Sequence, residues 1–189
     1  MSRAIAGIPG AWGGAHRLDF TAVASIVSIR RARTSDLPAI LAIYNRSVAT
    51  ETASFDLEPA TLSDRAAWLA VHGGDFPVLV TEIDGTLAGY ASLSRYNPKP
   101  AYDITAELSV YVAEDFRRQG VAWALSEAIL ELARAGSLVT VVSLVTSENA
   151  ASLHLHERLG FREVGTLHRS GRKFGRLLDV IFLEKDISG

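Results

Sequence analysis

The sequence contains no cysteine among its 189 residues. This absence excludes disulfide bonds, thiolate nucleophiles and thiolate metal sites together. No apolar run approaches the roughly 18 to 20 residues that a membrane-spanning helix needs. The formal net charge is -2, and no basic stripe suggests a nucleic-acid surface. We therefore expect a cytoplasmic protein whose partner is a small molecule, with neither nucleic acid nor membrane as a partner.

The first 27 residues differ from the rest of the chain. Residues 1–16 are rich in Gly, Ala and Pro without any period, and the apolar run at 23–27 is short for a signal peptide. We interpret 1–27 as a flexible N-terminal leader, with a targeting peptide as the alternative. Residues 28–189 then form one domain, for which this length is sufficient.

Hydrophobic periodicity predicts an alternation of strands and helices after residue 28. Helices are expected from Asp36, from Thr61, over 120–135 and over 149–159. Strands are expected over 29–33, 76–83, 87–94, 105–113, 138–145, 161–165 and 177–184. The order β-α-α-β-β-β-α-β-α-β-β indicates a mixed α/β (α+β) domain with one strand–helix–strand unit in its middle.

The turn between the strand at 105–113 and the following helix is the strongest local signal. It reads Arg117-Arg118-Gln119-Gly120-Val121-Ala122. Small residues let backbone N–H groups approach a ligand, and the helix that follows points its positive dipole end at the same place. The turn lacks the Gly-Lys-Ser/Thr of a nucleotide P-loop and the three glycines of a dinucleotide site. A solvated polar loop is the alternative, but the position between strand and helix favours phosphate binding.

The preceding strand carries a candidate base. Strand alternation divides its side chains between two faces. The polar face holds Glu107, Ser109 and Tyr111, and the apolar face holds Leu108, Val110 and Val112. A carboxylate in a half-buried cleft has its pKa raised by desolvation and becomes a better base near neutrality. The alternative is that Glu107 is a strand carboxylate paired with a nearby arginine.

The helix at 149–159 begins with a good N-cap, Asn149, and contains His154 and His156. Taken alone, His156 could be a polar surface residue. The two histidines lie two positions apart and face different ways, which argues against a shared metal site. Because the other histidines have no carboxylates at ligand spacing, we predict no catalytic metal.

The Gly120 turn together with the segment Asn-x-x-Ser…His-x-x-Leu-Gly-Phe at 149–161 resembles the GNAT N-acetyltransferases. The resemblance extends over residues 29–187. It is closer to the phosphinothricin and methionine sulfoximine acetyltransferases through the segments 101–103, 105–107, 110–112, 156–157 and 179–180. It implies a mostly antiparallel central sheet with flanking helices, and a β-α-β core that binds acetyl-CoA as co-substrate.

By this resemblance, the cofactor would be held by backbone and side-chain groups of one strand, one turn and one helix start. These residues are Val110, Tyr111, Val112, Arg117, Arg118, Gln119, Gly120, Val121, Ala122 and Asn149. Glu107 matches a proposed general base, and His156 matches a histidine proposed to assist catalysis. Phe55, Lys99, Tyr102 and Glu107 would shape the site of a small amino-acid-like amine. The resemblance also implies a homodimer.

The chemistry makes these assignments reasonable. An amine attacks a thioester only when unprotonated, so Glu107 would remove a proton directly or through a water. A backbone N–H near Val110 to Val112 would stabilise the developing oxyanion. The leaving thiolate needs a proton or a hydrogen bond, for which His156 and Tyr111 are both candidates, and the sequence does not rank them.

Three departures from the relatives concern the acceptor more than the reaction. Ala122 stands where relatives often have glycine, Lys99 replaces an arginine of a herbicide-acetylating relative, and Leu177 replaces a tryptophan. The expected acceptor is phosphinothricin or methionine sulfoximine or sulfone. The alternatives are a protein or drug amine, or an acyl-CoA-binding module without turnover.

Overall fold

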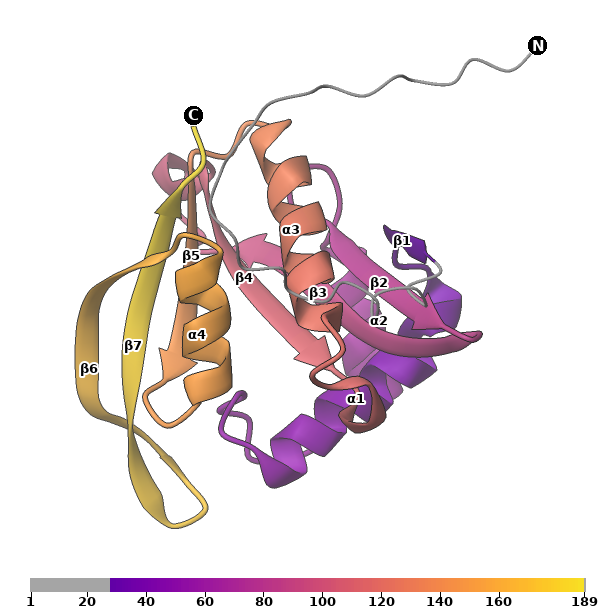
Figure 1. Cartoon of the computed structure of the whole chain (residues 1–189), viewed down its shortest axis with the longest axis horizontal. Helices are drawn as coiled ribbons and strands as arrows, with labels where there is room; N and C mark the ends of the chain where they lie inside the picture. Colours follow the sequence, from indigo (N-terminus) through magenta and orange to yellow (C-terminus); the bar gives the residue numbers. More distant parts are fainter. Residues whose placement is uncertain (1–27, 189) are drawn as a thin grey trace, which may run out of the picture.

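A computed structural model describes residues 28–188, which contain one seven-stranded sheet with helices on both faces (Figure 1). The strands are β1 (Ser28–Arg31), β2 (Val78–Ile83), β3 (Thr86–Arg95), β4 (Thr105–Val112), β5 (Thr140–Thr146), β6 (Arg162–Lys173) and β7 (Arg176–Asp186). The helices are α1 (Leu37–Thr50), α2 (Leu62–Ala70), α3 (Val121–Arg134) and α4 (Ala150–Arg158). Short 3-10 turns lie at Thr34–Asp36, Pro100–Tyr102 and Glu114–Phe116.

The predicted order of elements is confirmed, and so is the mixed sheet. The strand order is β1-β2-β3-β4-β5-β7-β6, and every neighbouring pair is antiparallel except β4 and β5. That parallel pair is joined by α3, as a strand–helix–strand unit requires. β2 and β3 form a hairpin whose two turn residues, Asp84 and Gly85, have positive φ, of 50° and 75°.

The last hairpin is longer than the sequence predicted. We expected a strand to end at Gly165, but β6 continues to Lys173 and pairs with β7 as far as Arg176. Its outer half is largely exposed and polar, so it lacks the apolar alternation that marks a half-buried strand. In Figure 1 this hairpin forms the edge of the sheet beside α4.

Each face of the sheet has its own core. Leu108 and the inner parts of Val110 and Val112 pack with α3 in the larger cluster, which includes the fully buried Leu125 and Ile129. On the other face, Tyr90 and Tyr111 pack with α1 and α2 through residues such as Ile40 and Trp68. The alternation predicted for β4 is therefore confirmed, and it gives the strand one apolar face and one aromatic, partly polar face.

The parallel pair of β4 and β5 stays together only briefly. Thr105, Ala106 and Glu107 pair with Thr140, Val141 and Val142. Beyond these residues, β4 and β5 do not pair with each other. Beyond Glu107, β4 remains paired with β3 and β5 remains paired with β7. The sheet therefore splits between β4 and β5, and the inner edge of β4 is left without a strand partner.

The expected leader at 1–27 lies outside the described residues. Among residues 28–188, no helix is long and apolar enough to cross a membrane. The first described element is β1, which starts at Ser28, and the expected domain boundary stays a prediction.

Gly89 determines how closely α3 can approach the sheet. A Cβ built at Gly89 would lie 2.7 Å from the Tyr111 carbonyl oxygen and 3.1 Å from Cγ1 of Val121, the first residue of α3. A contact below 3 Å with a backbone atom can be relieved only by moving that backbone. Gly89 thus helps to seat the start of α3 against β4.

We expect Gly89→Ala to lower the free energy of unfolding by about 1–3 kcal/mol, the usual cost of overpacking a close-packed core. Urea denaturation measures this difference. The matched control is Gly165→Ala on β6, where a Cβ meets nothing within 4 Å. Equal stability of Gly89→Ala and the wild type would show that the core relaxes without cost.

Candidate functional site

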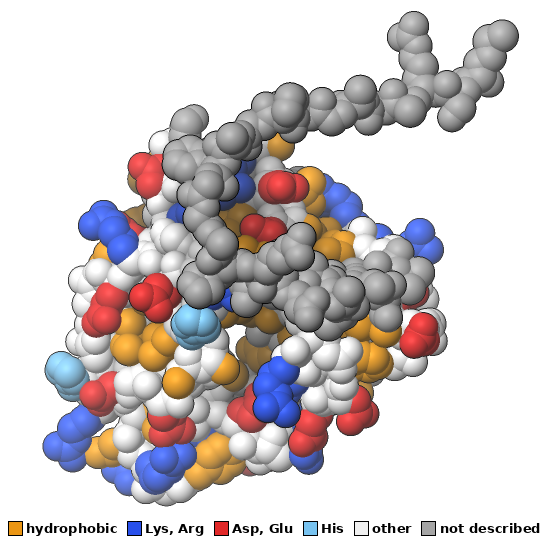
Figure 2. Space-filling view, in the orientation of Figure 1, with side chains coloured by type: hydrophobic (Ala, Val, Ile, Leu, Met, Phe, Trp, Pro, Cys, Tyr) orange, Lys and Arg blue, Asp and Glu red, His pale blue; other side chains and the backbone are white. Residues whose placement is uncertain are grey.

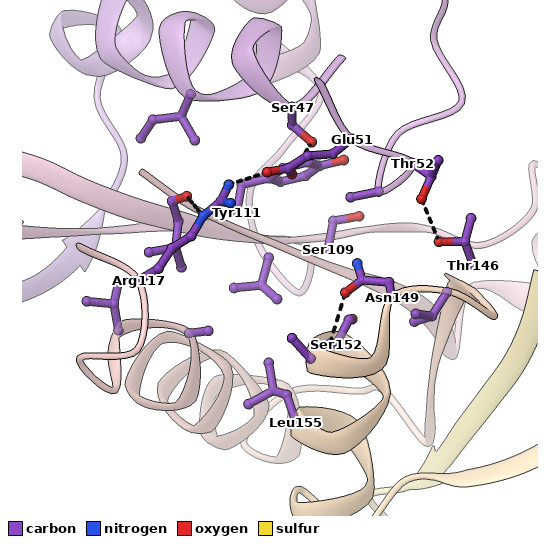
Figure 3. A pocket seen from close by; sticks show the side chains of 18 of the residues that line it. Ser47, Glu51, Thr52, Ser109, Tyr111, Arg117, Thr146, Asn149, Ser152 and Leu155 are labelled. Carbon is purple, nitrogen blue, oxygen red and sulfur yellow. Dashed lines mark hydrogen bonds and ion pairs between the residues drawn. The ribbon is translucent and has the colours of Figure 1, made fainter. Parts of the chain in front are cut away.

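The split between β4 and β5 opens into a cavity of about 950 Å³. Its walls come from the C-terminal part of α1, the inner edge of β4, the end of β5 and the first turns of α3 and α4 (Figure 3). Figure 2 shows the surface hollowed between α4 and the part formed by α1. The cavity thus passes through the sheet where the strands diverge.

The inner edge of β4 presents free backbone groups to this cavity. The N–H of Ala113 donates to Ala88 O at 2.9 Å, which sets the alternation of hydrogen bonds between β4 and β3. By that alternation Glu107, Ser109 and Tyr111 bond to β3, while Val110 and Val112 turn their N–H and C=O groups toward the gap. Val110, Tyr111 and Val112 all line the cavity, as the sequence analysis predicts for residues that contact a cofactor arm.

The turn before α3 borders the same cavity. Gly120 has φ of 82° and no side chain caps the helix, whose first internal bond runs from Ala124 N to Gly120 O. The N–H groups of Val121, Ala122 and Trp123 therefore lack helical partners, which suits an anion. Arg117, Arg118, Gly120, Val121 and Ala122 line the cavity. Gln119 does not, because its side-chain amide turns back to Asp115 O at 2.9 Å.

The charged side chains around the cavity are mostly cationic. Five arginines and three glutamates line it. Each glutamate forms an ion pair: Glu51 with Arg117, Glu114 with Arg46, and Glu148 with Arg176. Arg158 lies over the Trp123 ring, 4.5 Å from its centroid, and neither it nor Arg118 has an ion pair within residues 28–188. The lining thus carries a positive excess that suits a polyanionic ligand.

Two contacts cross the cavity and start from adjacent residues at the end of α1. Arg117 Nη2 donates to Glu51, which also accepts from Ser47 Oγ at 3.1 Å. Thr52 Oγ1 lies 3.1 Å from Thr146 Oγ1 of β5. Figure 3 shows these crossings at opposite sides of the cavity. Sequence reasoning missed Ser47, Glu51, Thr52 and Thr146, because no motif marks them and only the fold brings them to the strand gap.

Helix α4 has Asn149 at its N-cap and His156 in its last turn. The Asn149 side chain accepts from Ser152 N at 3.1 Å, which confirms it as the N-cap. His156 Nδ1 lies 2.8 Å from Ser152 O. A carbonyl only accepts, so Nδ1 carries the proton and Nε2 is a bare acceptor. That Nε2 is buried and has no partner in the described chain, and burial lowers the pKa of His156. His156 is therefore not a polar surface residue.

Glu107 occupies the last paired position of β4 and β5, where the strands separate. It is half-buried, and it forms no ion pair or hydrogen bond with another side chain of residues 28–188. Desolvation raises the pKa of its carboxyl. Glu107 is not among the residues that line the cavity, whereas Ser109 and Tyr111 of the same face are.

Tyr111 belongs to an aromatic cluster on the α1 and α2 side of the sheet. Its ring stacks on Tyr90 at 5.1 Å between centroids and meets the edge of Tyr44 at 5.6 Å. Burial raises the pKa of the Tyr111 phenol, so it keeps its proton. The Arg65 guanidinium covers the Tyr44 ring at 3.6 Å and helps to close this cluster.

The four residues expected at the acceptor, Phe55, Lys99, Tyr102 and Glu107, all lie outside the cavity lining. Lys99 and Tyr102 are exposed on the connection between β3 and β4, where the Tyr102 ring packs against Tyr96 at 5.6 Å. Phe55 is 41% exposed on the loop after α1. Lys99 and Tyr102 thus come from one connection and Phe55 from another.

Groups of three or more His, Cys, Asp or Glu that could hold a metal ion do not occur within residues 28–188. The expectation that catalysis needs no metal stays a prediction.

Comparison with known proteins agrees with this geometry. The model of the Acetyltransferase (GNAT) family matches residues 40–161. An L-methionine sulfoximine/L-methionine sulfone acetyltransferase of Pseudomonas aeruginosa is 41% identical over 162 residues, which cover 85% of this chain and 94% of that protein. A phosphinothricin N-acetyltransferase of Alcaligenes faecalis is 39% identical over 163 residues, covering 85% and 83%. The solved structure of yncA from Salmonella typhimurium with its cofactor acetyl-CoA superimposes with a TM-score of 0.82 at 33% identity, covering 86% and 94%.

The His156 hydrogen bond makes a spectroscopic prediction. At neutral pH, the ring should be uncharged with its proton on Nδ1, because burial lowers its pKa and Ser152 O holds that proton. Nitrogen-15 NMR of the imidazoles measures the tautomer, and His156→Gln identifies the signals by their loss. A protonated Nε2 at neutral pH would contradict the assignment.

Proposed function

The chain belongs to the acetyltransferase (GNAT) family, and we propose that it transfers acetyl from acetyl-CoA to the amine of a small amino-acid-like substrate. Methionine sulfoximine, methionine sulfone and phosphinothricin are the acceptors that the relatives' names suggest. The observation that carries the proposal is the cavity at the β4–β5 split, with free strand amides on one wall and an uncapped helix start on another.

The residues present fit acetyl-CoA, which supplies the acetyl group as a thioester when bound. The open N–H groups of 121–123 and the arginines around them suit a diphosphate. Val110 and Val112 offer backbone groups to an amide-containing arm of the ligand, which would lie where the neighbouring strand is missing. One of these N–H groups is also the natural donor to an oxygen that gains negative charge.

Glu107 is the proposed general base. Its place at the strand split, its partial burial and its lack of an ion pair within the described chain distinguish it from a structural carboxylate. Because Glu107 lies beside the cavity rather than in its wall, we propose that it takes the proton from an amine on the acceptor side, directly or through one water. The exposed Lys99 and Tyr102 would hold the polar end of the acceptor there.

The protonation of His156 and Tyr111 supports a choice between the two candidates for the leaving sulfur. In neutral His156 the Nε2 atom carries a lone pair and no proton, so Nε2 can accept a hydrogen bond but cannot donate one. Tyr111 keeps its phenolic proton because burial raises its pKa. We therefore propose Tyr111 as the donor to the departing sulfur and His156 as an acceptor that orients a nearby N–H or water.

The expected homodimer and the cytoplasmic location remain predictions. Multi-angle light scattering of the purified chain measures the mass in solution, for which we expect twice the monomer mass.

Replacing the proposed base tests the function most directly. Glu107→Gln should reduce kcat by about 100- to 10,000-fold, the usual contribution of general base catalysis, while the Kd for acetyl-CoA stays within about twofold. Thiol release in the presence of methionine sulfoximine measures turnover, and calorimetry measures Kd. Glu163→Gln, at an exposed position on β6, is the matched control. Unchanged turnover in Glu107→Gln would remove Glu107 as the base.

The raised pKa of Glu107 predicts the shape of the pH profile. Glu107 takes the proton of the bound α-ammonium group, which titrates near about 8, so log kcat/KM should be level between the pKa of Glu107 and that pH. Below the pKa of Glu107 the base is protonated, and log kcat/KM should fall with a slope of one. Because desolvation raises that pKa, this break should lie above the ordinary glutamate value of 4.5. A profile of Glu107→Gln without the break would confirm its origin, and an unchanged break would contradict it.

A further inference from the structure

The loop after α1 is anchored on β6 by a buried lysine. Lys173 Nζ donates to the carbonyl oxygen of Ser54 at 2.6 Å, and Lys173 is only 3% exposed. Enclosing an ammonium group is costly, and burial lowers the pKa of Lys173 accordingly. A side chain kept in such a place, with a neutral carbonyl as its hydrogen-bond partner, fixes the position of that backbone.

The next residue of the loop rests on a glycine of the same strand. A Cβ built at Gly171 would lie 2.1 Å from Cε2, 2.7 Å from Cδ2 and 2.8 Å from Cζ of Phe55. Gly171 does not have a positive φ, so glycine is needed here for space rather than for backbone freedom. The Phe55 ring therefore lies flush against the strand only because residue 171 has no side chain.

These two contacts lie at the border of the cavity. Thr52 and Ala53, which precede Ser54 in the chain, line the cavity. Phe174 and Arg176, which follow Lys173 in the chain, also line it. The Thr52–Thr146 contact, next to this junction, is on the opposite side of the cavity from Arg117 (Figure 3). If the diphosphate lies at the Gly120 turn, the junction of loop and hairpin faces the end where the acceptor must approach.

We propose that Gly171 and Lys173 are positioning residues that set acceptor specificity, by seating the Phe55 ring and the Ser54 backbone. The inference rests on the proposed function and on the expectation, from the family resemblance, that Phe55 shapes the acceptor site. The width of the acceptor site is then decided by the β6–β7 hairpin, which lies more than 110 residues later in the chain than Phe55.

The chemistry predicts a selective effect. An alanine at 171 must displace the Phe55 ring, and the ring can turn toward solvent because it is already 41% exposed. Such a shift alters a contact with the acceptor while leaving the strand edge and the Gly120 turn in place. A single pocket contact of this kind changes discrimination by roughly tenfold.

The experiment compares Gly171→Ala with Gly165→Ala, a glycine of the same strand with no atom near its Cβ. Thiol release is measured with methionine sulfoximine, methionine sulfone and phosphinothricin, varying each acceptor and acetyl-CoA separately. Gly171→Ala should change the acceptor KM, and the ratio between acceptors, by roughly tenfold, while KM for acetyl-CoA stays within about twofold. Gly165→Ala should match the wild type.

A double variant tests whether Gly171→Ala acts through the position of the Phe55 ring or through a general disturbance of the fold. Phe55→Leu removes the ring atoms that a Cβ at 171 would strike, so Gly171→Ala should lose most of its effect in the Phe55→Leu background. Lys173→Met should also raise the acceptor KM, because it removes the donor to Ser54. Thermal melting checks folding, and the glycine pair carries the test if Lys173→Met does not fold.

One set of results would contradict the inference alone, and a different result would contradict the proposed function as well. If the wild type acetylates at least one acceptor and folded Gly171→Ala has the acceptor KM of Gly165→Ala, the inference alone fails. It also fails if the effects of Phe55→Leu and Gly171→Ala simply add, or if KM for acetyl-CoA rises as much as KM for the acceptor. If the wild type acetylates none of the three acceptors, the proposed function fails and the inference fails with it.

Discussion

The separation of β4 from β5 after Glu107 is the constraint on which the rest of this site depends. Paired strands would satisfy each other's backbone groups and leave no room between them. Once they diverge, the N–H groups of Val110 and Val112 have no strand partner, and a cavity of about 950 Å³ opens at the same place. Gly89 and the Gly120 turn then bring the uncapped start of α3 to its edge. One departure from regular pairing thus creates both the space and the donors.

Electrostatics divides the site between two sides of the sheet. Around the cavity, the five arginines outnumber the three glutamates, and each glutamate is already paired. On the α1 and α2 side, burial raises the pKa values of Glu107 and Tyr111 without any ion pair to Glu107 in the described chain. In the proposed function, a phosphorylated ligand and the proton-accepting carboxylate would therefore lie in separate environments, so that the two anions do not repel each other directly.

Local signals in the sequence were sufficient to predict the elements and the turn before α3. The alternation along 105–112, the Gly120 turn and the Asn149 cap depend on neighbours in the chain, so each could be recognised from short segments. The outer half of β6 could not, because its strand conformation comes from pairing with β7 rather than from an apolar pattern. Glu51 and Thr52 carried no signal either, since their roles come from contacts with Arg117 and Thr146, 66 and 94 residues away.

By itself, the sequence determined the order of elements, the two faces of β4, the family and the identity of the candidate base, because each depends on residue type and spacing. Tertiary structure alone decided where β4 and β5 part, that Thr52 meets Thr146, and that Phe55 rests on Gly171. These outcomes depend on distances between segments far apart in the chain, and packing sets such distances only when the whole domain is folded.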